Sequence, residues 1–391
     1  MPRHLFLRPW PLPWLVAAWL ALCPWQAIAA DLIAGPDGQP MSLQQALTAA
    51  RDGDVIGLLP GEYRGQVALI QHKQLTLRGL GKRPVFVADG KIAEGKAILV
   101  IRDGDITIEN IEFRGARASD ANGAGIRFEK GRLTVRRSAF FDNENGILTA
   151  NDGAAEMTIE DSEFGQAPQV VGGLHHLLYV GRIARVTITG SRFHQGFEGH
   201  LIKSRARETR IAYNLIHDGP NGRASYQVDI PNGGIATLIG NVIGQGGMAE
   251  NPVVVAYGAE GRAWDRNVLA LSHNTFINRR WLPAWFLRVW RDRLPEATEV
   301  RAVNNLSVGP GIFTLGVAGE FSGNFPALGS SLIGADTLAF ELARDSIWVG
   351  RGADPRHIGG QDLSPRAEFA FPIGTRALAP LTRWSPGAFQ R

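Results

Sequence analysis

Internal repetition of one short pattern limits what this chain can fold into more than any other feature. A segment of alternating apolar and polar residues recurs, with its last residues 27, 24, 29, 23, 27 and 33 positions apart. The copies are Ile106–Phe113, Leu133–Phe140, Met157–Phe164, Val186–Phe193, Thr209–Ile216, Ala236–Ile243 and Leu269–Phe276. Alternation with a period of two predicts a strand. An Asn or Ser near the end of each copy favours a tight bend.

A second set of short apolar segments lies between these copies. They are Gly125–Phe128, Gly146–Thr149, His176–Val180, His200–Ser204, Tyr226–Ile230 and Val253–Tyr257. Two or three short strands per turn of about 25 residues are typical of a β-solenoid, in which each coil pairs with its neighbours. A propeller needs longer repeats, and a Rossmann-type sheet needs helices that these Gly-rich gaps cannot hold. The sequence therefore predicts an all-β, right-handed parallel β-helix of about nine to twelve coils.

The two ends of such a solenoid need caps, because they expose strand edges. The segment Ser42–Arg51 predicts a short helical cap with Ser42 as its N-cap. The coils become irregular after Trp281, and the Trp/Leu-rich stretch to Arg293 predicts a short helix or a long loop. We expect the tail at 387–389 to pack on the last coil. No linker divides the chain, so residues 30–391 form one domain, with regular coils to about 280 and irregular coils plus a C-terminal cap over 281–391.

The first residues have the pattern of an export signal. Arg3 and Arg8 precede an apolar stretch, Trp14–Cys23, and the small residues that follow fit cleavage after Ala29 or Ala30. The apolar stretch is too short and too rich in Pro for a membrane span of about 20 residues. We therefore expect residues 1–29 to be a signal peptide, and the mature chain to be secreted or periplasmic and free of the membrane.

Charge and cysteine content exclude several classes of protein. The formal net charge is +4, from 41 basic and 37 acidic residues, without a basic run or stripe. This balance does not indicate nucleic-acid binding. The one cysteine, Cys23, lies in the expected signal peptide, so no disulfide framework exists. We expect the mature protein to be a monomer.

Candidate functional residues concentrate between residues 175 and 234, which contain five of the nine histidines. If Ile202 points into the core, alternation places Leu201, Lys203 and Arg205 on the outer face. The opposite choice would bury Lys203 without a partner, at a cost of several kcal/mol. The same argument places Tyr179, and both Gln227 and Asp229, on the outside.

Parallel coils lie about 4.8 Å apart, which brings outward residues of consecutive coils together. We therefore expect Tyr179, Lys203 and Asp229 to form one column, with Arg205 on the same face. The plain alternative is a solvated ion-pair ladder, which would stabilise the fold by about 0.2–1 kcal/mol per pair.

Cations and aromatic rings along an elongated face suit an extended anionic polymer, because Arg and Lys bind carboxylates. An exported chain favours an anionic polysaccharide as the partner. The candidate catalytic residues are Lys203, Arg205, Tyr179 and His200, and the candidate substrate-binding residues are Asp229, Arg207, Arg223, Tyr226 and His176. The acids are dispersed and lack Ca²⁺-loop spacing, so neither a metal site nor a cofactor is indicated, although Ca²⁺ remains chemically open.

The repeat pattern resembles the pectate-lyase-like β-helix superfamily over almost all of the mature chain. Leu201–Ser204 (Leu-Ile-Lys-Ser), followed by Arg210–Asn214 (Arg-Ile-Ala-Tyr-Asn), resembles the chondroitinase-B/alginate-lyase group over about one and a half coils. The resemblance implies a Lys base and an Arg acid for β-elimination. Lys203 matches the Lys, but Asp229 stands where that group has its Arg, so Arg205 or Arg223 would have to substitute.

β-Elimination from a uronic acid needs a neutralised carboxylate, a base at C5 and a proton for the leaving oxygen. Lys203 is the expected base if neighbouring Arg205 and Arg207 favour its neutral form. Arg205 would neutralise the carboxylate, and Tyr179 or His200 would be the acid. A glycoside hydrolase, with Asp229 paired to Glu198 or Asp218, stays open. So do an epimerase and a non-catalytic carbohydrate-binding protein, whose stacking surface Trp281, Trp285 and Trp290 would supply.

Overall fold

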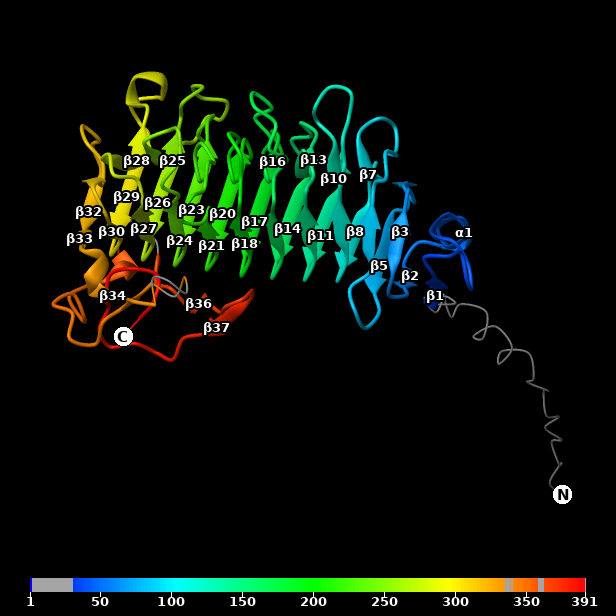
Figure 1. Cartoon of the computed structure of the whole chain (residues 1–391). Helices are drawn as coiled ribbons and strands as arrows, with labels where there is room; N and C mark the ends of the chain where they lie inside the picture. The colour runs from blue at the N-terminus through cyan, green and yellow to red at the C-terminus, as the bar shows by residue number, and fades with distance from the viewer. Residues whose placement is uncertain (2–30, 335–337, 339, 358–361, 391) are drawn as a thin grey trace.

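The chain winds into a right-handed parallel β-helix, as the repeats predict (Figure 1). The computed structural model describes Met1 and residues 31–390, apart from 335–337, 339 and 358–361. The expected signal peptide therefore lies outside the described residues. Within the described part, three parallel sheets of 12, 11 and 10 strands form the walls of the solenoid.

Each sheet takes one strand from successive coils. The 12-stranded sheet contains β1 (Asp31–Ala34), β2 (Val55–Leu58), β5 (Gln74–Gly79), β8 (Asp105–Glu109), β11 (Arg132–Arg136), β14 (Glu156–Glu160), β17 (Arg185–Thr189), β20 (Glu208–Ala212), β23 (Ile235–Ile239), β26 (Val268–Ser272), β29 (Glu299–Val303) and β32 (Glu320–Ser322). The 11-stranded sheet contains β3 (Glu62–Arg64), β6 (Val85–Val87), β9 (Glu112–Arg114), β12 (Ala139–Phe141), β15 (Glu163–Gly165), β18 (Arg192–His194), β21 (Leu215–His217), β24 (Val242–Gln245), β27 (Thr275–Asn278), β30 (Leu306–Val308) and β33 (Phe325–Ala327). The 10-stranded sheet contains β4 (Ala68–Ile70), β7 (Ala97–Ile101), β10 (Ala124–Phe128), β13 (Asn145–Thr149), β16 (Leu178–Val180), β19 (Ile202–Ser204), β22 (Val228–Ile230), β25 (Val253–Tyr257), β28 (Ala284–Val289) and β31 (Gly311–Ile312).

The two sets of repeated segments occupy the places that the sequence predicts. Each eight-residue copy provides one strand of the 12-stranded sheet and the next strand of the 11-stranded sheet, as β8 and β9 do. The second set provides strands of the 10-stranded sheet. The bend within a copy places its Asn or Ser in the interior, where Asn214, Asn241 and Asn274 hydrogen-bond to one another from coil to coil.

The interior is a continuous apolar core that inward side chains fill coil by coil. Six rings stack along the 11-stranded sheet with centroid separations of 4.6–5.7 Å. They belong to Tyr63, Phe86, Phe113, Phe140, Phe164 and Phe193. A stack of this length keeps neighbouring coils in register, because each ring packs on the ring before it.

Alternation fails where the chain enters the strands of the 10-stranded sheet, just before β19 and β22 and inside β25 and β28. Two consecutive side chains of one coil are buried in the same core cluster there, as Leu201 and Ile202 are. Gln227 occupies the equivalent position one coil later and is fully buried. The prediction that Leu201 and Gln227 point outward is therefore wrong. The chain bends before β19 and β22 begin, and a period of two holds only within a straight strand.

A short helix caps the N-terminal end, as predicted. Helix α1 (Leu43–Ala49) begins after Ser42, whose side chain accepts a hydrogen bond from the backbone N–H of Gln45. The Gln45 side chain accepts one from the Ser42 N–H in return, which completes a capping box. The apolar residues of this helix are buried against the first coils and cover their exposed edge.

The C-terminal part differs from the expectation in two ways. The regular coils continue past residue 280 to β33, and the stretch expected as a helix or loop contains strand β28, followed by a 3₁₀ turn at Arg291–Arg293. Phe286 and Leu287 are adjacent and both buried, so the sequence of β28 does not alternate and does not predict a strand.

The tail also packs elsewhere than expected. It forms two antiparallel pairs, β34 (Leu332–Ile333) with β35 (Glu341–Leu342) and β36 (Ala367–Phe369) with β37 (Thr375–Ala377), and further 3₁₀ turns at Gly329–Ser331 and Pro355–His357. Phe389 joins a cluster with residues of β21, β24, β27 and β30. The tail therefore covers the flank of several coils, below the solenoid in Figure 1, rather than the last coil alone.

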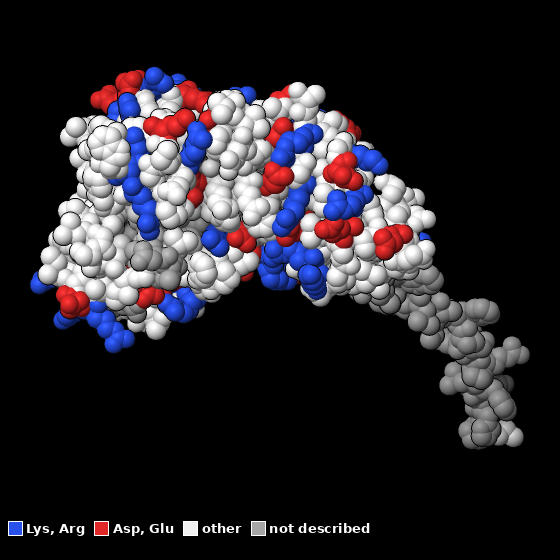
Figure 2. Space-filling model, viewed as in Figure 1, with Lys and Arg blue, Asp and Glu red and all other residues white. Residues whose placement is uncertain are grey.

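Charged side chains of both signs alternate on the outer face of the 12-stranded sheet. Arg185, for example, pairs with Glu156 at 3.6 Å and with Glu208 at 2.8 Å. Figure 2 views the molecule from the side of the 11-stranded sheet, where basic and acidic side chains also both occur. In the described part of the chain, no helix has the length and apolar character needed to cross a membrane.

Candidate functional site

The predicted outward column exists on three neighbouring strands of the 10-stranded sheet. Tyr179 of β16 pairs in register with Lys203 of β19, and Lys203 pairs with Asp229 of β22. Strand parity puts all three side chains on the outer face, while Ile202 and Val228 are buried in the core. Arg205 follows β19 on the same face, and its Nε donates to the Tyr179 hydroxyl at 3.2 Å.

A carboxylate that sequence reasoning missed lies at the centre of this cluster. Oε1 of Glu260 accepts a hydrogen bond from Lys203 Nζ at 3.3 Å and another from Arg205 Nη2 at 2.9 Å. Its Oε2 accepts from Arg205 Nη1, so the guanidinium holds the carboxylate with two parallel bonds. Arg205 Nη1 also contacts Asn232 Oδ1. Lys203 Nζ lies 3.6 Å from Asp229 Oδ2, so both cations already have anionic partners.

The loop between β25 and β26 positions Glu260. Its backbone N–H donates to the carbonyl of Pro231 at 2.8 Å, in the turn that follows β22. The Trp264 indole, from the same loop, donates to the carbonyl of Arg205 at 3.1 Å. These bonds hold the loop against the coils that provide Lys203 and Asp229.

Three rings stack beside the column, each three residues before the column residue of its coil and just before the strand begins. His176, His200 and Tyr226 have centroid separations of 4.8 Å and nearly parallel planes. The Tyr226 backbone N–H donates to His200 Nδ1, so the proton of the neutral imidazole is on Nε2. That Nε2 lies 3.4 Å from Asp229 Oδ2, so the ring and the carboxyl group are neighbours.

Burial shifts the pKa values of Asp229 and His200 in opposite directions. It raises the pKa of Asp229 to about 6, although the charge of Lys203 acts in the opposite direction. It lowers the pKa of His200 to about 3, with a further contribution from Lys203, so His200 is neutral at pH 7. Partial burial also acts to raise the pKa of Glu260. The hydrogen bond from Arg205 and the charge of Lys203 outweigh that effect, so this pKa lies below its ordinary value.

Comparison with known proteins supports the fold at low sequence identity. No family model matches the chain, and no curated protein matches it either. Among solved structures, pectate lyase Pel9A aligns with a TM-score of 0.68 and 14% identity, over 93% of this chain and 97% of that one. The fold is that of the pectate-lyase-like parallel β-helices. An alginate lyase from Paenibacillus sp. str. FPU-7 aligns with a TM-score of 0.49 and 14% identity, over 76% of this chain and 98% of that one.

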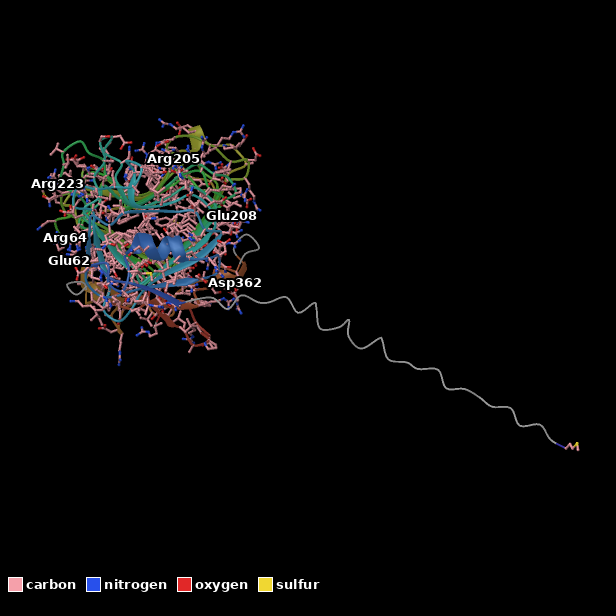
Figure 3. The ribbon with its side chains drawn as sticks, turned by 90° about the vertical axis from the view of Figure 1, so that its right-hand side faces the viewer. Glu62, Arg64, Arg205, Glu208, Arg223 and Asp362 are labelled. Carbon is pink, nitrogen blue, oxygen red and sulfur yellow. The ribbon has the colours of Figure 1, made fainter. Side chains whose placement is uncertain are left out.

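Two of the predicted residues lie away from the column of this pectate-lyase-like helix. Arg207 is exposed, and the contacts of the described residues do not join it to Lys203 or Glu260. Arg223 lies over the ring of Phe197, with 4.4 Å between its guanidinium carbon and the ring centroid. In the end-on view of Figure 3, Arg205 is at the top of the solenoid and Arg223 at its upper left.

The other seven predicted residues are brought together on the β-helix. The column and the ring stack contain Tyr179, Lys203, Arg205, Asp229, His176, His200 and Tyr226. Glu260 and Asn232 were missed, because loops between coils have no repeat that would reveal their partners. Within the described residues, no group of three or more His, Cys, Asp or Glu side chains is placed to hold a metal ion.

Proposed function

We propose that this chain is an exported lyase that cleaves a uronate-containing polysaccharide by β-elimination. The observation that supports it most is that Arg205 and Lys203 both hydrogen-bond the Glu260 carboxylate on the outer face of the solenoid. A uronate residue presents the same group, a carboxylate on a carbon that bears hydrogen. A substrate carboxylate that displaced Glu260 would therefore place its C–H bond beside Lys203 Nζ.

Displacement of Glu260 is physically reasonable. Its side chain is 44% exposed, whereas the side chains of Lys203 and Arg205 are 12% and 19% exposed. The loop carboxylate can swing towards water, while the two cations are fixed by the strand and by Tyr179. Binding then exchanges one bidentate Arg–carboxylate pair for another, so neither cation loses its partner.

The residues of the site take complementary roles in this proposal. Arg205 neutralises the substrate carboxylate. Lys203 first releases a proton from its ammonium group to water, and the neutral amine then removes the C5 proton. The electron pair of that C–H bond forms the C4–C5 double bond as the C4–oxygen bond breaks. Tyr179, whose hydroxyl contacts Arg205, gives a proton to the leaving oxygen. His200 is neutral, and its Nε2 lies 3.4 Å from Asp229 Oδ2, so its role is to position that carboxyl group rather than to act as the acid.

A hydrolase is the second candidate, and one observation favours it. Asp229 and Glu260 both lie within ion-pair distance of Lys203 Nζ, so their nearest oxygens are at most about 7 Å apart. Their pKa values are shifted in opposite directions, raised for Asp229 and lowered for Glu260. Opposite shifts are typical of an acid paired with a nucleophile or base.

One assay distinguishes these activities. The mature chain is incubated with polygalacturonate, alginate, hyaluronan and chondroitin sulfate, and both ultraviolet absorbance and new reducing ends are followed. We expect one polymer to yield both signals, because elimination leaves a conjugated double bond. Reducing ends without absorbance would indicate a hydrolase, and a changed uronate composition without cleavage an epimerase. Binding without any product would contradict the enzyme proposal.

Export is part of the proposal and has its own test. Mass spectrometry of the protein recovered from its native host should give an N-terminus at Ala30 or Asp31, because the small residues before them fit signal cleavage. A cytoplasmic protein that keeps Met1 would contradict it.

A further inference from the structure

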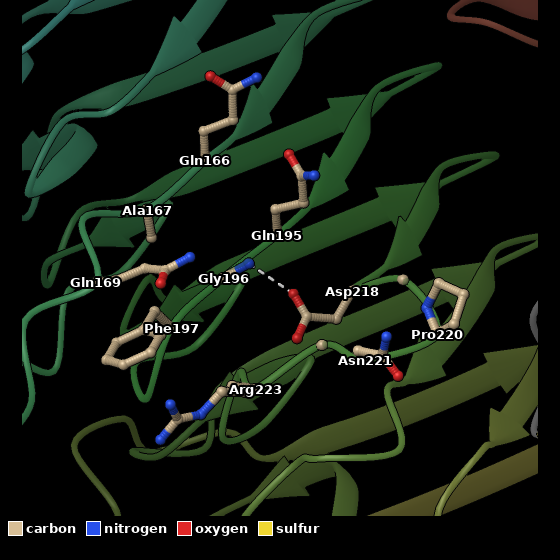
Figure 4. A pocket seen from close by; sticks show the side chains of 12 residues that line it. Gln166, Ala167, Gln169, Gln195, Gly196, Phe197, Asp218, Pro220, Asn221 and Arg223 are labelled. Atoms are coloured by element: carbon tan, nitrogen blue, oxygen red, sulfur yellow. Dashed lines mark hydrogen bonds between the residues drawn. The ribbon is translucent and has the colours of Figure 1, made fainter.

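A separate pocket opens at another corner of the same coils. It has a volume of about 480 Å³ and lies where the turns after β15, β18 and β21 lead towards the 10-stranded sheet. Figure 4 shows the residues that line it. They include four carboxamides, Gln166, Gln169, Gln195 and Asn221, together with Phe197 and Arg223. No residue of the column or of the ring stack contributes to this lining.

The carboxamides of the pocket are available to a ligand. All four side chains are exposed, and none of them makes a hydrogen bond among the described residues. Each primary amide offers two donors and one acceptor oxygen. A set of such groups around one cavity suits adjacent hydroxyl groups, which also donate and accept.

Backbone geometry shows that the turns themselves do not require these glutamines. Gln166 and Gln195 follow β15 and β18 with φ values of 55° and 54°, in the left-handed region. Gly115 follows β9 in the same way, with φ 76°. A side chain other than Gly in this region costs about 1–2 kcal/mol. Asp142 follows β12 with φ 53°, so side chains other than Gly recur at this turn, and what distinguishes the two coils of the pocket is a long amide side chain at that position.

The charged groups of the pocket are already balanced. Arg223 Nη2 lies 3.5 Å from Glu198 Oε1, and its guanidinium covers one face of Phe197. Asp218 is buried, and its two oxygens accept backbone hydrogen bonds from Gly196 at 2.6 Å and Ala224 at 2.7 Å. The one cation among the described lining residues thus has an anionic partner, and the Asp218 carboxyl group is held by backbone N–H groups, in contrast to a site that selects carboxylates.

We infer that this pocket binds a neutral pyranose residue. The amides of Gln166, Gln195 and Asn221 would hydrogen-bond its hydroxyl groups. The pocket lies close to the proposed catalytic face, since Phe197 and His200 are only three positions apart in sequence, a span of at most about 11 Å. The inference goes beyond the lyase proposal, because sugar binding here does not depend on Lys203.

Saturation-transfer NMR with methyl glycosides of glucose, galactose, mannose and rhamnose tests this site. The decisive variant is Gln166→Gly with Gln195→Gly, which removes both side chains and relieves the backbone at both turns, so the fold should be retained. We expect at least one glycoside to bind, and the double variant to weaken that binding at least tenfold. Gln44→Ala, on α1 at the N-terminal cap, and Lys203→Ala should leave it unchanged.

Two results would overturn the inference. One is that no glycoside of the panel binds at millimolar concentration, and the other is that the double variant binds as the parent does. A second titration, with a neutral oligosaccharide of the sugar that binds, distinguishes a residue within a polymer from a free sugar as the natural ligand. Tighter binding of the oligosaccharide indicates a residue within a polymer, and equal binding indicates a free sugar. Both outcomes agree with a neutral pyranose site.

Discussion

Replacing Lys203 with alanine is expected to lower turnover on the uronate polymer by at least about a hundredfold, because the base that removes the C5 proton is lost. The KM should change much less than kcat, since Arg205 still binds the substrate carboxylate. Initial rates from ultraviolet absorbance give both parameters. Lys130→Ala is a matched control, because Lys130 also pairs with a carboxylate, Asp103 at 3.6 Å, on an exposed turn after β10, three coils away from Lys203.

The same variant has a stability signature that depends on pH. Asp229 is buried, and its native pKa of about 6 lies above its unfolded value, so native stability falls as pH rises through that interval. Lys203 opposes this loss by favouring the ionised form. Without Lys203, the loss is larger at pH 8, where Asp229 would be charged and unpaired, than at pH 5, where it is mostly protonated.

Thermal unfolding at the two pH values measures this difference. At pH 8 we expect the loss to exceed the change of under about 1 kcal/mol typical of a surface substitution. Near-parental turnover in Lys203→Ala would contradict the assignment of Lys203 as the base. Equal destabilisation at both pH values would contradict the coupling between Lys203 and Asp229.

The regular part of the fold could be predicted because each coil repeats the same pattern of apolar and polar residues. Period-two alternation and a small polar bend residue recur at Asn214 and Asn241, and their spacing alone aligns neighbouring coils. That alignment also predicted the register of Tyr179, Lys203 and Asp229. Residues on regular strands are thus accessible to sequence reasoning, since parity and coil spacing determine their neighbours.

The parts that were missed all depend on departures from this regularity. Leu201 and Gln227 face inward because the chain bends before the strand. The adjacent buried residues Phe286 and Leu287 break the alternation that would have predicted β28. Glu260 reaches Lys203 from a loop 57 residues away in sequence, and no periodicity predicts where a loop side chain points. The consequence is chemical as well as structural. The expected cationic row is already neutralised, and carboxylates rather than arginines are nearest to Lys203.

Replacing Arg205 with methionine is expected to lower kcat/KM by at least about a hundredfold. Methionine keeps much of the aliphatic bulk but removes the fork that holds the carboxylate and neutralises charge developing on it in the transition state. Loss of one such donor costs about 10²–10³ in rate in other enzymes. Arg210→Met is the matched control, because Arg210 is exposed on β20 of the 12-stranded sheet.

Glu260→Gln, measured in the same assay, separates the two candidate mechanisms. In the lyase, Glu260 only occupies the place of the substrate carboxylate, so its neutral analogue should bind Arg205 less tightly and lower KM while kcat is kept. In a hydrolase, Glu260 would be the nucleophile or base beside protonated Asp229, and the same change would abolish turnover. A Glu260→Gln variant without activity, together with a largely active Arg205→Met, would therefore reject β-elimination and assign the reaction to the two carboxylates.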